Sequence, residues 1–265
     1  MTFPEVPDFG QFRTAVKSQI LSYVNTYRFW VIFGIVLAVG GGIDIAFTIK
    51  GAAWVQANFG PQAYGYVAAE TSFLPFLAIV TGAFFGGDAI STDFGTKTGY
   101  YMLAQPVRRS ILLTGRYVAA LLVSAGVFAI FYLFTIYGGS AFYAFSSIPW
   151  ANLALSYLFS ILLILGILSF AFTLSATSRS PAIGLVVTII ILLVVFNIAD
   201  GLVIRFAGSQ YVVYSILYAS GIISGVVAAG LPTTGPTIPV GIAIMVVYAV
   251  LFFVVAQALY HREET

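Results

Sequence analysis

Long apolar runs, separated by short polar segments, dominate the pattern along the chain. A helix that crosses a membrane needs about 20 consecutive, mostly apolar residues. The pattern therefore predicts transmembrane helices over residues 29–49, 66–87, 111–137, 150–175, 181–199 and 239–260. We expect the third and fourth to be separated by Gly138-Gly139-Ser140 and by the turn at residues 146–149.

The first 28 residues show a different periodicity. Apolar side chains recur there at steps of three and four residues, at Phe9, Phe12, Val16, Ile20, Val24 and Tyr27. This spacing places them on one face of a helix and leaves polar residues on the others. We expect residues 1–28 to form an amphipathic helix in the membrane interface, with Arg13, Lys17 and Arg28 near the lipid headgroups. The alternative is a solvent helix packed on a partner.

Residues 207–229 are apolar enough to cross the membrane, but Gly221, Gly225 and several Ser, Tyr and Gln residues interrupt them. Irregular backbone is tolerated at membrane depth only where protein or water satisfies it. We therefore expect this segment not to cross. It should dip into the outer leaflet or form short external helices between the fifth and sixth spans.

The composition supports a membrane protein. The chain is 60% hydrophobic and only 8% charged, whereas a soluble domain is about a quarter charged. The fold class expected is an all-α polytopic membrane protein with six spans. We expect one domain over residues 1–265, made of the interfacial helix (1–28) and a transmembrane region (29–265).

The distribution of Lys and Arg predicts the orientation, because cytoplasmic loops carry an excess of these residues. With the N-terminus inside, only Lys50 and Arg205 lie outside. The cytoplasmic positions are Arg13, Lys17, Arg28, Lys97, Arg108, Arg109, Arg116, Arg179 and Arg262. We therefore expect a multi-pass protein of the cell (plasma) membrane with both termini in the cytoplasm.

Several kinds of chemistry find no support. The chain has no cysteine and a single histidine, His261 near the C-terminus. A GxxxxGK[ST] phosphate loop is absent, and the string at residues 95–99 lacks its spacing. No GxSxG or HExxH motif and no carboxylate pair placed for hydrolysis occurs. We expect no enzyme activity, metal or cofactor in this chain, and no nucleic-acid partner, because the charges lie at the ends of spans.

The densest polar segment lies between the second and third spans, at residues 88–116. It holds six charged residues: Asp88, Asp93, Lys97, Arg108, Arg109 and Arg116. Ser91, Thr92 or Asp93 can cap a short helix, and Pro106 ends it because the residue before proline is disfavoured in helical geometry. The expected result is a short helix held at both ends by spans.

The motifs of this segment occur in a fixed order. They are Asp88-x-Ile90-Ser91-x-Asp93, Lys97-Thr98-Gly99, Leu103-x-x-Pro106-Val107-x-Arg109 and Leu112-Leu113-x-Gly115-Arg116. The segment resembles the corresponding segment in the permease of type-2 ATP-binding-cassette (ABC) exporters. The six-span topology and the N-terminal helix are similar to that family as well. The family most often has Glu, Ser and Lys at positions 93, 108 and 116.

The resemblance implies that the segment is a coupling helix that docks on a separate P-loop ATPase, which binds the ATP and Mg. The coupling residues that it implies are Asp88, Asp93, Lys97, Thr98, Gly99, Tyr100, Pro106, Arg108 and Arg109. It also implies a homodimer, or a heterodimer with a related permease. The expected function is the membrane subunit of an ATP-driven exporter, and the few interior charges favour an amphipathic or apolar cargo.

Three alternatives stay open. They are a secondary transporter driven by an ion gradient, a membrane-embedded enzyme, and a non-transporting scaffold of an ATPase complex. A secondary transporter needs buried titratable groups, and the third, fourth and sixth spans have no charged residue in their interiors.

Charged residues in other spans have two interpretations. Asp44, in the first span, is a candidate pathway residue or, as we favour, an interfacial residue that reaches water or Lys50. Asp200 and Arg205 are interpreted as a local pair and not as a functional site. Glu70, at the outer mouth of the second span, is interpreted in the same way, as a residue with a local role.

Single cysteines test the topology, since the chain contains none. We expect Ala57→Cys and Phe145→Cys to react with a membrane-impermeant thiol reagent added to intact cells. Lys97→Cys should react only after the cells are opened. External labelling of Lys97→Cys would contradict the orientation.

Overall fold

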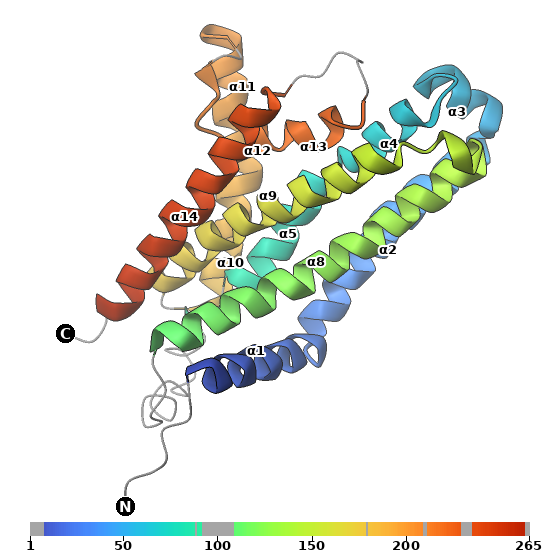
Figure 1. Ribbon diagram of the computed structural model, residues 1–265. Coiled ribbons are helices and arrows are strands. Elements are labelled where there is room, and N and C mark those ends of the chain that lie inside the picture. Colours follow the sequence, from blue (N-terminus) through green and yellow to red (C-terminus); the bar gives the residue numbers. More distant parts are fainter. Residues whose placement is uncertain are drawn as a thin grey trace, which may run out of the picture.

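The computed structural model describes residues 8–87, 89–91, 109–178, 180–208, 211–228 and 235–262 (Figure 1). These residues are helical, with turns between the helices and no strand among them. Six of their helical segments are long and apolar enough to cross a membrane: Tyr27–Lys50, Ala63–Gly86, Ser110–Phe142, Trp150–Thr177, Pro181–Phe206 and Ile238–Tyr260. The expected all-α, polytopic fold class is thereby confirmed.

The elements follow one another in a simple order along the chain. They are α1 (Asp8–Val24), α2 (Tyr27–Lys50), α3 (Ala52–Phe59), α4 (Ala63–Thr71), α5 (Leu74–Gly86), α8 (Arg109–Phe142), the 3₁₀ turn η1 (Phe145–Ser147), α9 (Trp150–Thr177), α10 (Pro181–Ile190), the π-helical turn η2 (Ile191–Val195), α11 (Phe196–Phe206), α12 (Ile216–Ala219), α13 (Gly221–Gly225) and α14 (Ile238–Arg262).

Two of the spans are composite. The second consists of α4 and α5, which meet at Ser72 and Phe73, just before Pro75 at the start of α5. Proline lacks the backbone N–H that would continue the ladder of hydrogen bonds. The fifth consists of α10, η2 and α11. The fifth span continues to Phe206, whereas the sequence predicted its end near residue 199. A polar residue such as Asp200 does not interrupt a helix.

The third span corrects the sequence prediction at its end. Gly138-Gly139-Ser140 was expected to break the helix, but α8 runs through all three residues to Phe142. The chain turns only at residues 143–149, around η1. Glycine lowers helix stability by about 1 kcal/mol without preventing a helix, and Gly138 proves to be a site of close approach.

The segment before the last span does not cross in one piece, as predicted. Among its described residues, α12 and α13 are two short helices joined at Ser220. They pack against α14, α9 and α4, and Ile216, Ile222 and Ile223 are buried. The Ser156 hydroxyl of α9 donates a 2.8 Å hydrogen bond to the carbonyl of Ile223, which fixes α13 to the bundle.

The N-terminal segment forms a helix, as predicted, over Asp8–Val24. α1 packs along α8, and a Cβ at Gly115 of α8 would lie only 3.0 Å from the Cβ of Ala15. Its apolar face is divided, because Tyr23 is buried whereas Phe9 is 77% exposed. α1 and the C-terminal end of α14 lie at the same end of the bundle, at the bottom of Figure 1. The interfacial position of α1 stays a prediction.

α9 is the centre of the packing. It contacts α5, α8, α10 and α14, and its side chains Leu163, Ile164, Ile167 and Phe172 are fully buried. Glycines allow the neighbours to come close: a Cβ at Gly86 of α5 would lie 2.8 Å from the Cβ of Ala171. Small residues at such crossings are typical of helix packing in membranes.

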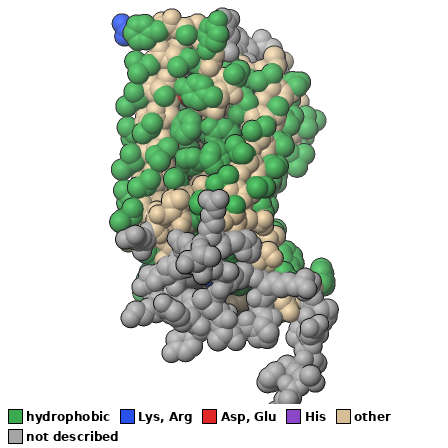
Figure 2. All heavy atoms as spheres, turned by 90° about the vertical axis from the view of Figure 1, so that its left-hand side faces the viewer, with side chains coloured by type: hydrophobic (Ala, Val, Ile, Leu, Met, Phe, Trp, Pro, Cys, Tyr) green, Lys and Arg blue, Asp and Glu red, His purple; other side chains and the backbone are tan. Residues whose placement is uncertain are grey.

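The outer surface is apolar. Figure 2 shows hydrophobic side chains over the face on the left-hand side of Figure 1, down to the residues that are not described. Large aliphatic side chains of α14 that are more than half exposed include Val247, Val250, Leu251 and Val254. A bilayer satisfies such a surface, whereas water does not, so the chain is a multi-pass membrane protein.

Gly86→Ala tests the packing of α5 on α9, with Gly126→Ala as its matched control. The new methyl group at position 86 would meet Ala171, whereas a Cβ at position 126 has no heavy atom within 4 Å. We expect Gly86→Ala to lower the stability by about 1–3 kcal/mol, the usual effect of overpacking. Gly126→Ala should be neutral or slightly stabilising. Thermal melting in detergent measures both, and equal midpoints would contradict the packing.

Candidate functional site

Most of the coupling residues implied by the sequence lie outside the described residues. They are Asp88, Asp93, Lys97, Thr98, Gly99, Tyr100, Pro106 and Arg108. The short helix expected between the second and third spans lies there too. Arg109 is the first residue of α8. What the structure describes is the way in which the two ends of this segment join the bundle.

The N-terminal end of the segment is fixed to α9. The Ser175 hydroxyl oxygen accepts hydrogen bonds from the backbone N–H groups of Ile90, at 3.0 Å, and Ser91, at 3.1 Å. Both of these residues are fully buried. One hydroxyl therefore satisfies two backbone donors that would otherwise be unpaired, an arrangement that holds residues 89–91 at the end of α9.

α8 fixes the same place from the other side. Arg116 is only 6% exposed, and its guanidinium Nη1 donates a 2.8 Å hydrogen bond to the carbonyl of Ala89. The sequence placed Arg116 among the charges of the polar segment, but the structure shows it inside the bundle. A charged donor makes a stronger hydrogen bond than a neutral one.

α1 reaches the end of α5 at this point. The Tyr23 hydroxyl donates a 3.0 Å hydrogen bond to the carbonyl of Phe85. Burial raises the pKa of Tyr23 to about 12, although the charge of Arg116 opposes this shift. The hydroxyl therefore keeps its proton, and its hydrogen bond, throughout the physiological range. We refer to Tyr23, Ala89, Ile90, Ser91, Arg116 and Ser175 as the clamp.

A second cluster lies towards the other end of the bundle, where α2, α4 and α8 meet. Asp44 of α2 is 6% exposed, and its Oδ1 accepts a 2.6 Å hydrogen bond from the Tyr66 hydroxyl of α4. The interpretation favoured from the sequence, that Asp44 reaches water or Lys50, is therefore wrong. The Lys50 ammonium instead lies over the ring of Trp54, 5.9 Å from its centroid.

Glu70 belongs to the same cluster. It follows Tyr66 by four residues on α4, so both side chains project from one helix face. Its exposure is 0%, and neither carboxyl oxygen has a hydrogen-bond partner. The hydroxyls of Tyr66 and Thr135 lie near it, as does the charge of Asp44. The sequence placed Glu70 at the outer mouth of the second span, and the structure shows its side chain buried inside the bundle. The i, i+4 spacing from Tyr66 was the signal that could have revealed the cluster.

Gly138 makes the cluster possible. A Cβ at this position of α8 would collide with the Tyr66 hydroxyl and with Asp44 Oδ1. Aromatic rings of Phe47, Phe59, Phe142 and Tyr143 surround the Tyr66 ring, with centroids 5.2–6.3 Å apart within this group. Among the residues that the structure describes, no three His, Cys, Asp or Glu side chains are grouped to hold a metal ion.

Comparison with known families places the chain. Residues 27–265 match the family model described as "Protein of unknown function (DUF2705)". The chain belongs to this family. No curated protein matched it. The matched range begins at the first residue of α2, so the DUF2705 region includes the buried carboxyl cluster and every clamp residue except Tyr23.

The predicted pair of Asp200 and Arg205 does not form in this DUF2705 protein. Asp200 Oδ2 accepts a 2.6 Å hydrogen bond from the Ser215 hydroxyl, and the Arg205 guanidinium lies over the ring of Phe206, 5.9 Å from its centroid. The two residues are five positions apart on one helix, a spacing that does not bring side chains onto the same face.

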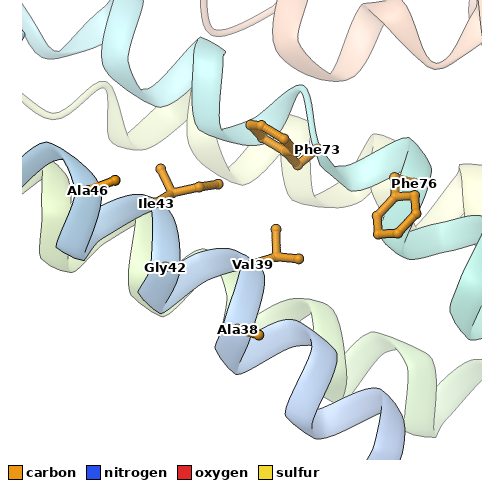
Figure 3. A pocket seen from close by; sticks show the side chains of 7 residues that line it. All are labelled: Ala38, Val39, Gly42, Ile43, Ala46, Phe73 and Phe76. Atoms are coloured by element: carbon orange, nitrogen blue, oxygen red, sulfur yellow. The ribbon is translucent and has the colours of Figure 1, made fainter.

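A groove of about 600 Å³ lies between α2 and the start of α5. Figure 3 shows Phe73 and Phe76 on one side of it and α2 on the other. Its lining is apolar: Ala38, Val39, Gly42, Ile43, Ala46, Phe73 and Phe76. The groove of this DUF2705 protein can therefore accept an apolar chain or ring, but it offers no side-chain hydrogen-bonding group.

Gly138→Ala and its neighbour Gly139→Ala test the geometry of the carboxyl cluster. Position 138 has no space for a methyl group beside Tyr66 and Asp44, whereas a Cβ at position 139 meets only Ile148 and Val67 at ordinary distances of 3.7–3.9 Å. We expect Gly138→Ala to destabilise the protein by about 1–3 kcal/mol and Gly139→Ala to be tolerated. Thermal melting in detergent measures the difference, and tolerance of both would contradict the cluster.

Proposed function

We propose that this chain is the membrane-spanning subunit of an ATP-driven exporter that takes its energy from a separate P-loop ATPase. The observation that carries the proposal is the clamp. The segment that resembles a type-2 ABC coupling helix begins at a point where α1, α5, α8 and α9 are hydrogen-bonded together. A loop that only joins two spans does not require such a connection.

The clamp suggests how force passes into the membrane. In the proposal, residues 91–109 rest on the ATPase, and closure of the ATPase pair on ATP moves them. The displacement passes through Ser175 into α9 and through Arg116 into α8, because these side chains bind the backbone at residues 89–91. Coupling of this kind is reciprocal, so ATP affinity and membrane conformation change each other.

The cargo class follows from the apolar lining of the membrane region. The groove between α2 and α5 has an apolar lining, and much of α2, α10, α11 and α14 is exposed. We propose that the chain forms a dimer, either with a second copy of itself or with a related permease. An amphipathic or apolar cargo would cross the membrane along the interface of this dimer. In the proposal, the protein lies in the plasma membrane with both termini in the cytoplasm. The cargo is moved out of the cytoplasm. ATP and Mg bind to the partner ATPase.

A secondary transporter is the second candidate function. One observation favours it, the presence of Asp44 and Glu70 inside the first two spans, since buried carboxyl groups often mark ion pathways. The clamp has no evident role in that function. A transporter of this class would move its cargo without the ATPase, and a scaffold would move none.

Ser175→Ala and Arg116→Ala test the clamp in the complex with its ATPase, reconstituted in lipid. Removal of a buried hydrogen-bond partner costs about 1–3 kcal/mol, and a typical coupling free energy between two sites is of the same size, a roughly 5–150-fold effect on affinity. We expect ATP hydrolysis to lose its stimulation by an amphipathic cargo such as a fluorescent phospholipid, while the ATPase stays bound. Asp93→Ala with Arg109→Ala should have the same effect.

Ser160→Ala is the matched control. Ser160 is a buried serine of the same helix, but its hydroxyl donates within α9, to the carbonyl of Tyr157. It should leave the stimulation unchanged. Unchanged stimulation in Ser175→Ala and Arg116→Ala, with the ATPase still bound, would show that residues 88–109 form only a charged loop.

A further inference from the structure

The carboxyl cluster has no part in the coupling described above, yet it buries two acidic side chains that have oxygens without a partner. Glu70 is fully buried with both oxygens unpartnered, and Asp44 Oδ2 is also buried without a partner. An ionised carboxylate in such a place loses its hydration without gaining a hydrogen bond or an ion pair. Buried carboxyl groups therefore tend to become neutral.

No described cation neutralises the pair. On α2, Lys50 lies over Trp54 and Arg28 lies in the first turn, towards the opposite end of that helix. On α8, Arg116 binds Ala89 in the clamp. The elements α3, α5 and α13 carry no Asp, Glu, Lys, Arg or His. The tyrosines that the cluster contacts are Tyr66, which binds Asp44, and Tyr143, whose ring packs on that of Tyr66.

The two carboxyl groups are not equivalent. Asp44 Oδ1 accepts a short hydrogen bond from Tyr66, which stabilises a negative charge on Asp44. Neither oxygen of Glu70 has a partner at hydrogen-bonding distance, although the hydroxyls of Tyr66 and Thr135 lie near it and the charge of Asp44 acts on it. Repulsion between like charges that share a site favours a proton on one of them. Because the Tyr66 hydroxyl donates its hydrogen bond to Asp44 and Thr135 donates to the carbonyl of Phe131, we assign that proton to Glu70.

The packing selects the ligand. The place beside Gly138 is filled by the Tyr66 hydroxyl and Asp44, and aromatic rings enclose Tyr66. A sodium or potassium ion would need several oxygen ligands and space for itself, whereas a proton needs only one carboxylate oxygen.

We propose that Asp44, Tyr66 and Glu70 form a proton-binding site, in which Glu70 holds the proton while α2, α4 and α8 are packed together. Binding adds one H⁺ to a carboxylate oxygen of Glu70, and release returns it to water. After release the site holds two negative charges, one on α2 and one on α4, so their repulsion favours separation of the two helices. In the proposed orientation the site responds to external pH.

Infrared spectroscopy of the purified protein in lipid tests this site without the ATPase or a cargo. A protonated carboxylic acid has its own carbonyl-stretching band, which shifts in D₂O. Exposed carboxyl groups are ionised at pH 7, since their ordinary pKa values lie near 4. We expect the parent to show this band at pH 7 and to lose it as the pH is raised.

Two matched variants assign the band. Glu70→Gln imitates the neutral acid in shape, so it should keep the thermal stability of the parent at pH 7 and lack the band. Asp200→Asn removes a carboxyl that accepts a hydrogen bond from Ser215, and it should keep the band.

The thermal midpoint of the parent should fall as the pH rises, because the folded state holds a proton that the unfolded state has released. Glu70→Gln should lose that dependence.

Three outcomes would overturn the proposal. The first is a parent without the band at pH 7. The second is a band that disappears in Asp44→Asn but persists in Glu70→Gln, which would assign the proton to Asp44. The third is a thermal midpoint that is higher in sodium or potassium chloride than in choline chloride and insensitive to pH, which would indicate a metal cation. None of them bears on coupling to an ATPase, so the two proposals fail separately.

Discussion

The close approach of α5 to α9 is the constraint on which the clamp depends. Gly82 and Gly86 present no side chains to α9, so the side chains of Ile167 and Ala171 pack directly against the backbone of α5. Residues 89–91, which follow the C-terminal end of α5, therefore lie beside Ser175. The upper end of the same span is α4, which carries Tyr66 and Glu70. One transmembrane segment thus connects the clamp with the buried carboxyl groups.

Many hydroxyl groups inside the spans follow one of two patterns. Some hydroxyls donate to a carbonyl of their own helix, as Thr71 does to Val67 and Ser124 to Ala120. Others join two helices, as Tyr157 of α9 does with the carbonyl of Ala125 in α8. Both patterns satisfy a donor where no water is available. Glu70 differs from these hydroxyls because it is an acidic group with both oxygens buried and without a partner, and this difference separates a functional hypothesis from ordinary packing.

Hydropathy predicted much of the architecture from the sequence. The six spans, the helix within residues 1–28 and the interruption after α11 all follow from the length and spacing of apolar residues, because each depends only on neighbours along the chain. Of the carboxyl cluster, the sequence identified Asp44 as a candidate and failed to connect it with Tyr66 and Glu70. The helix expected within residues 88–109 lies outside the described residues.

Tertiary structure decided which polar side chains meet. The sequence alone determined that Asp44, Glu70, Arg116 and Asp200 lie in or beside membrane spans. Only the rotation and crossing of the helices brought Asp44 to Tyr66, Arg116 to Ala89 and Asp200 to Ser215. Gly138 shows the difference most clearly: in sequence it resembles a helix break, but in the bundle it is the gap that Tyr66 and Asp44 fill. The physical reason is that hydropathy describes how each residue meets the membrane, whereas partners are set by contacts between distant segments.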